Sequence, residues 1–475
     1  MSLARSSAQM SLANVANAVV SFAAIAYFAR TLGAEGIGVF FLFEALLNIL
    51  ILPADFGIRS AVEKRLSEGT SPSSLLTTAF LLKSGPLLVI AAVILLLRGP
   101  INGYLGANVA VWLVVAIVTR EFAQQGIQVL RGELRVGESA VPWLSQSATW
   151  AGAGVVFVQF GFGVRGLIYG LIAGYVISFI WAMHRRSTPF GSPSWEHVGS
   201  LLDYSKFSFV SLIGGIVYKW MDILIIGFFL TSADVGAYEV AWRITLVVLL
   251  GSKAVATTIF PTMSRWDAER AVGRIENLIP WAVTASLIFV IPSLFGVLLF
   301  SEEILTFVFG SEYSIASLAL IVLMSGKVFE AIQDVVGRSL NAIDHPELAA
   351  RAAVIAIVFN LVLNTVLVTQ YGITGAAVAT VVSFVAETTM LTVYLSDFLT
   401  IRLFWQELGW FAASSIGMVL VLAGARSVVP VVSISHLAFA ILLGAVVYGM
   451  LVLSFPPLRT KVARGVRMLK SGDVG

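Results

Sequence analysis

Long apolar runs follow one another along the chain, and a short polar stretch separates each from the next. A membrane-spanning helix needs about 20 mostly apolar residues, and we count about fourteen such segments. Their approximate cores are residues 11–30, 37–57, 75–97, 105–127, 141–160, 164–183, 206–229, 236–260, 278–300, 314–338, 350–369, 373–395, 407–424 and 434–454. None alternates as the strands of a membrane β-barrel do, so the pattern predicts helices, which satisfy their own backbone hydrogen bonds in lipid.

Composition supports an all-α integral membrane protein. Of the 475 residues, 58% are hydrophobic and 12% are charged, with a mean hydropathy of +0.93, whereas about a quarter of a soluble domain is charged. The chain has no cysteine and four histidines without metal-ligand spacing, so we expect no metal site and no cofactor. We also expect no cleavable signal peptide, because no small-residue cleavage site follows the first apolar run.

The basic residues predict the topology. With the N-terminus in the cytoplasm, the cytoplasmic segments hold 20 Lys and Arg, whereas the outer loops hold four, which are Arg30, Arg98, Arg165 and Arg426. The positive-inside rule then places both termini of a multi-pass protein on the cytoplasmic side of the cytoplasmic membrane. This topology also explains the net charge of +3 without nucleic-acid binding, and no loop is long enough for a soluble catalytic domain.

Short glycine-containing strings recur along the chain. Gly38 in GAEGIGVF matches Gly236 in SADVGAY, 198 residues later, and GVRG at 163–166 matches GITG at 372–375, 209 residues later. Matches in the same order indicate an internal duplication, although short glycine loops also recur by chance. Glycine at such positions allows a positive φ or a close backbone approach.

The duplication predicts two lobes with the same orientation, because six helices separate the copies. We predict an N-terminal six-helix lobe over residues 1–200 and a second six-helix lobe over residues 201–400. Two additional helices and a basic cytoplasmic tail then occupy residues 401–475.

Several spans carry polar stripes on one helical face. A charge at the centre of a spanning helix costs about 2.5–3.5 kcal/mol, so these side chains should face the protein interior or a hydrated cavity. Cations there could hold a phosphate or diphosphate, and amides could hold a glycan. The candidate cavity residues are Asn14, Asn17, Arg30, Glu44, Asn48, Lys219, Asp222, Glu239, Arg243, Lys253, Lys327, Glu330 and Asp334.

Pairing within a helix is an equally open interpretation of these charges. Three pairs, Lys219–Asp222, Glu239–Arg243 and Lys327–Glu330, are spaced three or four residues apart and could neutralise each other. Three acids have no obvious partner on their own helix and are candidates for binding a coupling proton or cation; they are Glu44, Asp55 and Glu387.

Two strings resemble those of a known transporter family. FARTLGAEGIGVF (28–40) resembles the signature after the first helix of polysaccharide-biosynthesis or O-antigen-type flippases, and YGITGAAVATVVS (371–383) is similar to the start of their twelfth helix. That family belongs to the multidrug/oligosaccharidyl-lipid/polysaccharide exporter superfamily, with its MATE-like fold. The resemblance implies two six-helix lobes that face a central cavity and work by alternating access, with helices one, two, seven and eight lining the cavity.

The resemblance implies a flippase rather than an enzyme. Its substrate would be a polyprenyl- or dolichyl-linked oligosaccharide used for surface polysaccharide or glycoprotein glycan assembly. Membrane lipids and glycan polymerase or transferase machinery would be its partners. The sequence has no nucleophile triad, P-loop or metal cluster that would favour covalent chemistry. Two alternatives stay open: a cation-coupled multidrug exporter of the same superfamily, and a membrane glycosyltransferase or ligase, which the short loops disfavour.

Overall fold

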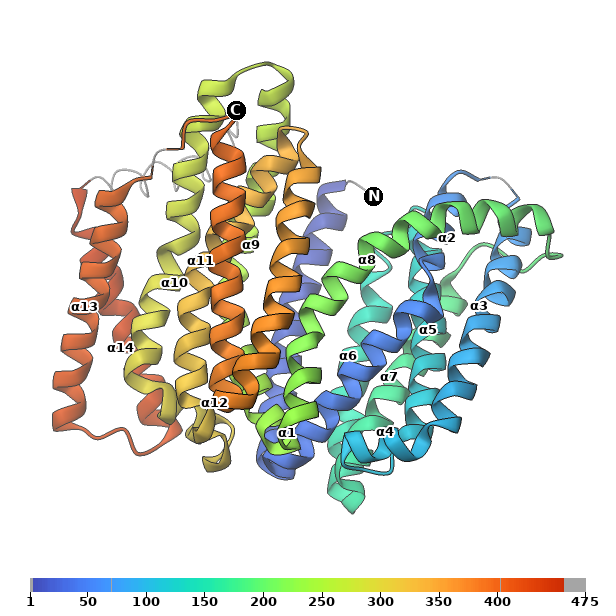
Figure 1. Ribbon diagram of the computed structural model, residues 1–475, viewed down its shortest axis with the longest axis horizontal. Helices are drawn as coiled ribbons and strands as arrows, with labels where there is room; N and C mark the ends of the chain where they lie inside the picture. The colour runs from blue at the N-terminus through green and yellow to red at the C-terminus, as the bar shows by residue number, and fades with distance from the viewer. Residues whose placement is uncertain (1–2, 70, 402, 457–475) are drawn as a thin grey trace. The chain divides into compact units, whose positions relative to one another are not determined.

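The computed structural model describes residues 3–69, 71–401 and 403–456, with their side chains apart from residues 3–15, 207, 208 and 210–213. Its regular structure is helical throughout these ranges (Figure 1). The elements are α1 (Leu3–Asp55), α2 (Ile58–Ser67), α3 (Pro72–Leu96), α4 (Arg98–Leu105), α5 (Ala110–Gly132), α6 (Ala140–Phe157), η1 (Val158–Phe162), α7 (Gly163–Arg185), α8 (Trp195–Phe229), α9 (Ser232–Ala268), α10 (Val272–Val308), η2 (Ser311–Ala316), α11 (Ser317–Ala342), α12 (Pro346–Ser396), α13 (Trp405–Val428) and α14 (Ile434–Leu453).

The chain folds as two compact units, Met1–Glu239 and Val240–Gly475. The division falls inside α9, near residue 240, rather than in a loop. This division into two compact units does not test the predicted lobe boundaries at residues 200 and 400, which stay a prediction.

The membrane character predicted from the sequence is confirmed. Among the described residues, nine helices are long and apolar enough to cross a membrane, or ten if α4 and α5, which meet at 94°, count as one span. Three of the nine are 40, 46 and 51 residues long, and each covers two of the spans predicted from the sequence. They are Ala16–Asp55, Ala140–Arg185 and Pro346–Ser396.

Glycines interrupt these three long helices. Gly33 breaks the helical geometry of α1 with φ 72°, and Gly163, which opens α7, has φ 55° and ψ −138°. Gly372 inside α12 has nearly the same geometry as Gly163, with φ 60° and ψ −144°. A side chain disfavours such angles, so the glycines expected to mark tight turns do so here.

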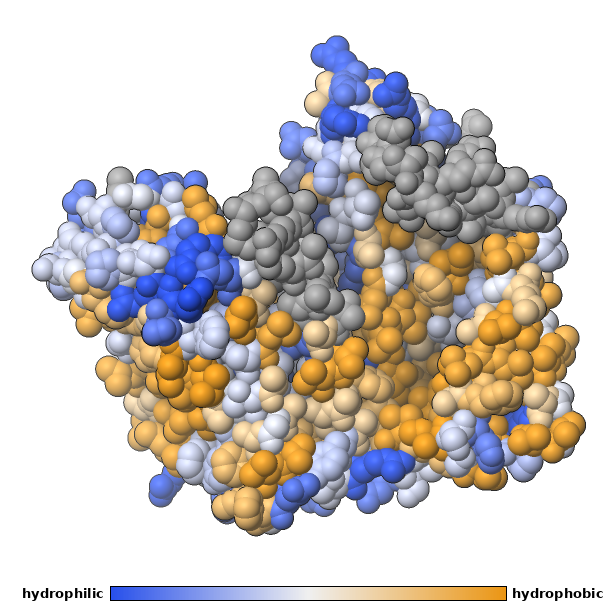
Figure 2. Space-filling model, turned by 180° about the vertical axis from the view of Figure 1, so that it is seen from behind, coloured by the Kyte–Doolittle hydropathy of each residue, from blue (hydrophilic) through white to orange (hydrophobic). Residues whose placement is uncertain are grey.

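Apolar side chains cover much of the surface of both units. In Figure 2 they dominate the middle of the face shown, and hydrophilic side chains gather toward its ends. Large exposed examples include Leu88, Leu96 and Phe228 in the first unit, and Val428, Phe439 and Met450 in the second. In water such a surface would aggregate, whereas in a bilayer it contacts lipid.

A polar cluster fixes the connection between α5 and α6 to the end of α7. Glu133 accepts hydrogen bonds from the backbone N–H groups of Ser187 and Thr188, at 2.8 and 2.7 Å. Arg135 donates to Glu138 at 2.9 Å and to the Ser187 hydroxyl at 3.0 Å. The hydrogen bond from Arg135 holds the pKa of the Glu138 carboxyl below its ordinary value of 4.5.

Candidate functional site

Four ionisable side chains form a cluster in the first unit; three of them are buried, and the fourth, Arg59, keeps 15% of its side chain exposed. Lys83 Nζ lies 2.9 Å from the Asp55 carboxylate and 2.7 Å from the Glu121 carboxylate, and it donates to Gln125 at 3.2 Å. Arg59 Nε donates to the other Asp55 oxygen at 2.9 Å. Lys83 and Glu121 have no exposed surface, and Asp55 is 2% exposed. Two cations and two anions balance, which is what such deep burial of charge requires.

The backbone brings Asp55 into this cluster at the end of α1. After Asp55, Phe56 and Gly57 take positive φ angles of 46° and 78°, which end α1 and let α2 start in a new direction. Gly57 has no room for a side chain, because a Cβ there would lie 2.5 Å from the Ser205 carbonyl oxygen of α8. The Phe56 ring packs on Phe209, with centroids 4.8 Å apart. The cluster therefore lies at the sharp turn between α1 and α2 and stabilises it.

A second polar contact lies on α1, nearer to its N-terminus than Asp55. Arg120 Nη2 of α5 donates to Asn48 Oδ1 at 2.8 Å, and Asn48 Nδ2 donates to the Glu44 carbonyl oxygen at 2.7 Å. Glu44 is partly exposed, whereas Asn48 is 9% exposed. The predicted pair of cavity residues, Glu44 and Asn48, thus lies beside a cation from another helix.

The predicted residues of the seventh span, and Glu239 at the start of the eighth, have separate surroundings. Asp222 accepts a hydrogen bond from the Tyr238 hydroxyl at 2.8 Å. Lys219 is exposed, with its Nζ 5.1 Å from the centroid of the Trp220 ring. Glu239 is buried, at 5% exposure. Lys219 is thereby the most accessible of the three.

In the second unit, Lys327 sits in an aromatic and acidic enclosure. Its Nζ contacts Glu330 at 2.6 Å and lies 3.6 Å from the centroid of Trp242 and 5.4 Å from that of Phe384. Lys327 has no exposed surface. The Lys327–Glu330 pair expected from helical spacing is therefore present, and cation–π contact adds to it.

Lys253 and Asp334 lie close to this enclosure. Helix α9 contacts α11 here: the Ser252 hydroxyl donates a hydrogen bond to the Ala331 carbonyl oxygen at 3.4 Å. The charges of Lys253 and Lys327 both act on Asp334. Lys253 is exposed, whereas Asp334 is partly buried. The structure thus brings together the predicted residues Lys253, Lys327, Glu330 and Asp334.

Glu387 of α12 lies near α11. It is 6% exposed and lies within range of Gln333 and Glu330 of α11, and the next residue, Thr388, donates to the Phe329 carbonyl oxygen at 3.2 Å.

The remaining predicted residues are Asn14, Asn17, Arg30 and Arg243. The Asn14 side chain is outside the described residues. Asn17 is partly exposed, and Arg30 is exposed just before the break at Gly33. Arg243 is partly exposed in the second unit. No group of three or more potential metal ligands occurs in the described part of the chain.

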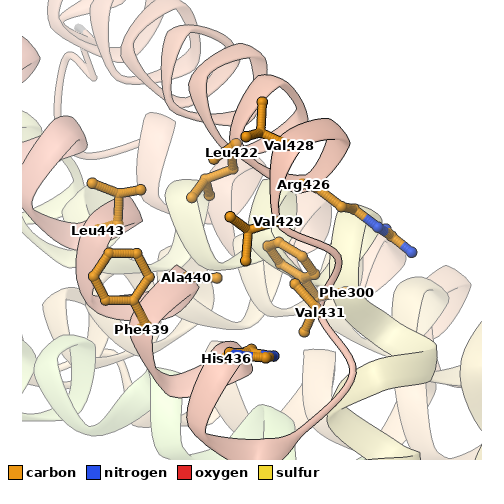
Figure 3. Close-up of a pocket in the computed structure, with 11 residues that line it drawn as sticks. Phe300, Leu422, Arg426, Val428, Val429, Val431, His436, Phe439, Ala440 and Leu443 are labelled. Atoms are coloured by element: carbon orange, nitrogen blue, oxygen red, sulfur yellow. The ribbon is translucent and has the colours of Figure 1, made fainter.

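An apolar pocket of about 270 Å³ lies elsewhere in the second unit, between α10, α13 and α14. Phe300, Leu422, Phe439 and Leu443 line it, and the Arg426 guanidinium points away from it (Figure 3). None of the predicted site residues contributes to this pocket, so it is separate from the polar stripes.

Comparison with known proteins decides the family. Residues 27–318 match the model of a family described as polysaccharide biosynthesis protein. The chain is 46% identical to the probable low-salt glycan biosynthesis flippase Agl15 of Haloferax volcanii, over 97% of both chains. The chain belongs to the polysaccharide biosynthesis protein family. The probable flippase AglR of Haloferax volcanii is a second relative in sequence, 30% identical over 100% of this chain and 99% of its own.

Solved structures give the fold of this polysaccharide biosynthesis protein. The inward closed conformation of the lipid II flippase MurJ matches 94% of this chain and 98% of its own with a TM-score of 0.78 at 18% identity. An inward-facing multidrug resistance MATE transporter of the MOP superfamily matches 80% of this chain and 94% of its own, with a TM-score of 0.65 and 18% identity. The resemblance seen in the two short strings is confirmed, and so is the MATE-like fold.

Two residues of the polar network were absent from the sequence-based candidates: Lys83 and Glu121. Each is an ionisable residue inside an apolar run, and that alone is a signal of function or pairing. Spacing along one helix could not place them, because their partners lie on other helices.

Proposed function

We propose that this protein is a flippase that moves a lipid-linked oligosaccharide across the cytoplasmic membrane by alternating access, for surface polysaccharide or glycoprotein glycan assembly. One observation carries the proposal: 46% identity along 97% of the chain to a protein named as a probable glycan biosynthesis flippase. A polyprenyl or dolichyl carrier would supply the lipid. Membrane lipids surround the protein, and glycan polymerase or transferase machinery would act before or after it.

We propose fourteen membrane crossings with both termini in the cytoplasm. The number follows when the three long helices are divided at their glycine breaks, α4 with α5 is taken as one bent span, and α8 is added. The excess of basic residues in the proposed cytoplasmic segments supports the orientation. The matching geometry of Gly163 and Gly372 supports a parallel repeat of two six-helix lobes.

We propose that the polar stripes line the transport path. Lys219 and Lys253 are exposed and are available to an anionic headgroup, and Arg243 is partly exposed. Lys327 is enclosed, so we propose that it supports the path by its contacts with Glu330 and Trp242 rather than by direct contact with the headgroup. Glu44, Asp55 and Glu387 remain the candidates for ion coupling, with Asp55 engaged by Lys83 and Arg59 in this conformation.

Lipid extracts from cells with and without the gene test this function. Mass spectrometry of carrier-linked sugars is combined with measurement of the finished glycan at the cell surface. Loss of the gene should accumulate the carrier-linked glycan and deplete the surface glycan, and the intact gene should restore both. Normal glycan lipids, together with raised sensitivity to cationic drugs, would contradict the proposal and indicate multidrug export.

A further inference from the structure

Arg120 lies near the middle of the 23-residue α5, deep in the proposed membrane-spanning part of the first unit. It is partly exposed. Its guanidinium donates to Asn48 Oδ1 at 2.8 Å, and Asn48 is oriented by its own hydrogen bond to the Glu44 carbonyl oxygen. With the Asn48 amide nitrogen used in that way, its oxygen is fixed toward Arg120.

Arg120 makes no ion pair in the described part of the chain, although Glu44 and Glu121 lie near enough that their charges and that of Arg120 all act on the Tyr175 hydroxyl. The adjacent acid, Glu121, is already paired with Lys83 at 2.7 Å, and Asp55 is shared between Lys83 and Arg59. Among the described residues, no carboxylate oxygen lies within 4.0 Å of the Arg120 guanidinium, which has a neutral amide as its hydrogen-bond partner. An arginine within a membrane span is costly without an anion or water, and the guanidinium, which contacts no carboxylate directly, can take an anion from outside the chain.

The chemistry of the group indicates which anion fits. A guanidinium offers five N–H donors in a planar fork that matches the oxygens of a phosphate. At 1.5 Å per residue, Arg120 lies about 15 Å along α5 from its first residue, Ala110, a position near the middle of the proposed span. The substrate of the proposed flippase would carry such an anion through the span.

We infer that Arg120 binds the phosphate or diphosphate of the lipid-linked substrate during its passage, with Asn48 as the positioning residue that aims the guanidinium. The inference rests on the proposed function and adds to it a named anion-binding residue in the first unit. It also distinguishes Arg120 from Lys83 and Lys327, whose charges are already neutralised by carboxylates of the chain.

Binding to the purified full-length protein in lipid nanodiscs tests the inference. The probes are geranylgeranyl diphosphate, inorganic pyrophosphate and the neutral alcohol geranylgeraniol. The variants are Arg120→Gln, Arg120→Lys, Asn48→Ala and, as a matched control, Arg274→Gln, since Arg274 is exposed and its closest carboxylate is 3.9 Å away. Thermal unfolding of each variant checks the fold before binding is measured.

We expect Arg120→Gln to weaken binding of the prenyl diphosphate about tenfold or more, the loss of a charge-assisted bidentate contact. Arg120→Lys should retain part of the affinity, and Arg274→Gln all of it. Geranylgeraniol should bind all variants equally. Unchanged diphosphate binding in Arg120→Gln overturns the inference, as does an equal loss for the alcohol. Inorganic pyrophosphate that binds as tightly as the prenyl diphosphate would also overturn it, because the ligand would then be a free anion.

Failure of the inference is separable from failure of the proposed function. If the intact gene restores the surface glycan and Arg120→Gln restores it equally well, Arg120 is not the phosphate contact, and flipping stands. If the intact gene does not restore the glycan, the function itself is contradicted, whatever Arg120→Gln does in the binding assay.

Discussion

Gly38 and Gly236 lie against each other where α1 crosses the start of α9, and neither position has room for a side chain. A Cβ on Gly38 would lie 1.6 Å from the Ser232 carbonyl oxygen, and a Cβ on Gly236 would lie 2.2 Å from the Ala34 carbonyl oxygen. The contact is reciprocal and joins backbone to backbone. The two glycines that the sequence comparison paired, 198 residues apart, are thus direct neighbours.

Gly38→Ala should destabilise the protein markedly. The obstructing atoms belong to the backbone, so relief requires α1 and α9 to separate, and overpacking of this kind costs about 1–3 kcal/mol or more. Thermal unfolding of the purified protein measures the effect. Gly103→Ala is the matched control, because nothing lies within 4 Å of a Cβ there, and in a helix alanine is favoured over glycine. Equal melting temperatures for Gly38→Ala and wild type would contradict the close contact.

Lys83→Met should be among the most damaging single changes in the first unit. It leaves the Glu121 carboxylate buried without its cation, and breaking a buried pair costs about 3–5 kcal/mol. The double variant Lys83→Met/Glu121→Gln removes the charges in balance, while Asp55 keeps Arg59. We expect the double variant to regain much of the lost stability in a thermal unfolding assay. A double variant no more stable than Lys83→Met would show that the cluster is not a balanced charge network.

The sequence anticipated features that depend on one helix or one turn. Spacing of three residues predicted the Lys327–Glu330 pair, which is present at 2.6 Å, and Gly163 and Gly372 have the positive φ angles that their positions implied. These features are local, since helical periodicity and the conformational freedom of glycine decide them.

Contacts between helices were beyond such reasoning. Lys83 meets Asp55 and Glu121 because α3, the end of α1 and α5 converge, and no spacing along one helix encodes that convergence. The Trp242 ring over Lys327 depends in the same way on the packing of α9 against α11. The fold class was therefore predictable from the sequence, whereas the partners in the polar network required the structure.

Trp242→Leu should weaken the second unit through loss of the ring over Lys327. A desolvated cation–π contact contributes about 2 kcal/mol, and the Lys327 Nζ is 3.6 Å from the ring centroid with no surface exposed. Trp242→Phe should cost less, because a smaller ring is kept. The same substitutions in a Lys327→Met/Glu330→Gln background give the coupling energy. If Trp242→Leu costs as much there as in wild type, the cation–π contribution is absent.

The connection between α5 and α6 should loosen at acid pH. The pKa of Glu138 is lowered by its hydrogen bond from Arg135, so the anchoring contribution is fully present above pH 4.5 and is lost as the pH falls below that value. A nitroxide label at Val136→Cys reports the change, since the chain has no other cysteine. We expect label mobility to rise below pH 4.5, and to be high already at neutral pH in Glu138→Gln. A label equally immobile in both proteins at all pH values would contradict this role of Glu138.

Flipping by the purified protein is the most direct test of its function. The protein is reconstituted into liposomes with a fluorescent short-chain polyprenyl diphosphate sugar in the membrane, and a quencher that cannot cross is added outside. We expect wild type to let the quencher reach the label of the whole lipid pool, whereas protein-free liposomes lose only the outer half of the signal. Proteoliposomes that retain the inner half as fully as empty liposomes do, with protein confirmed to be folded, would contradict a flippase.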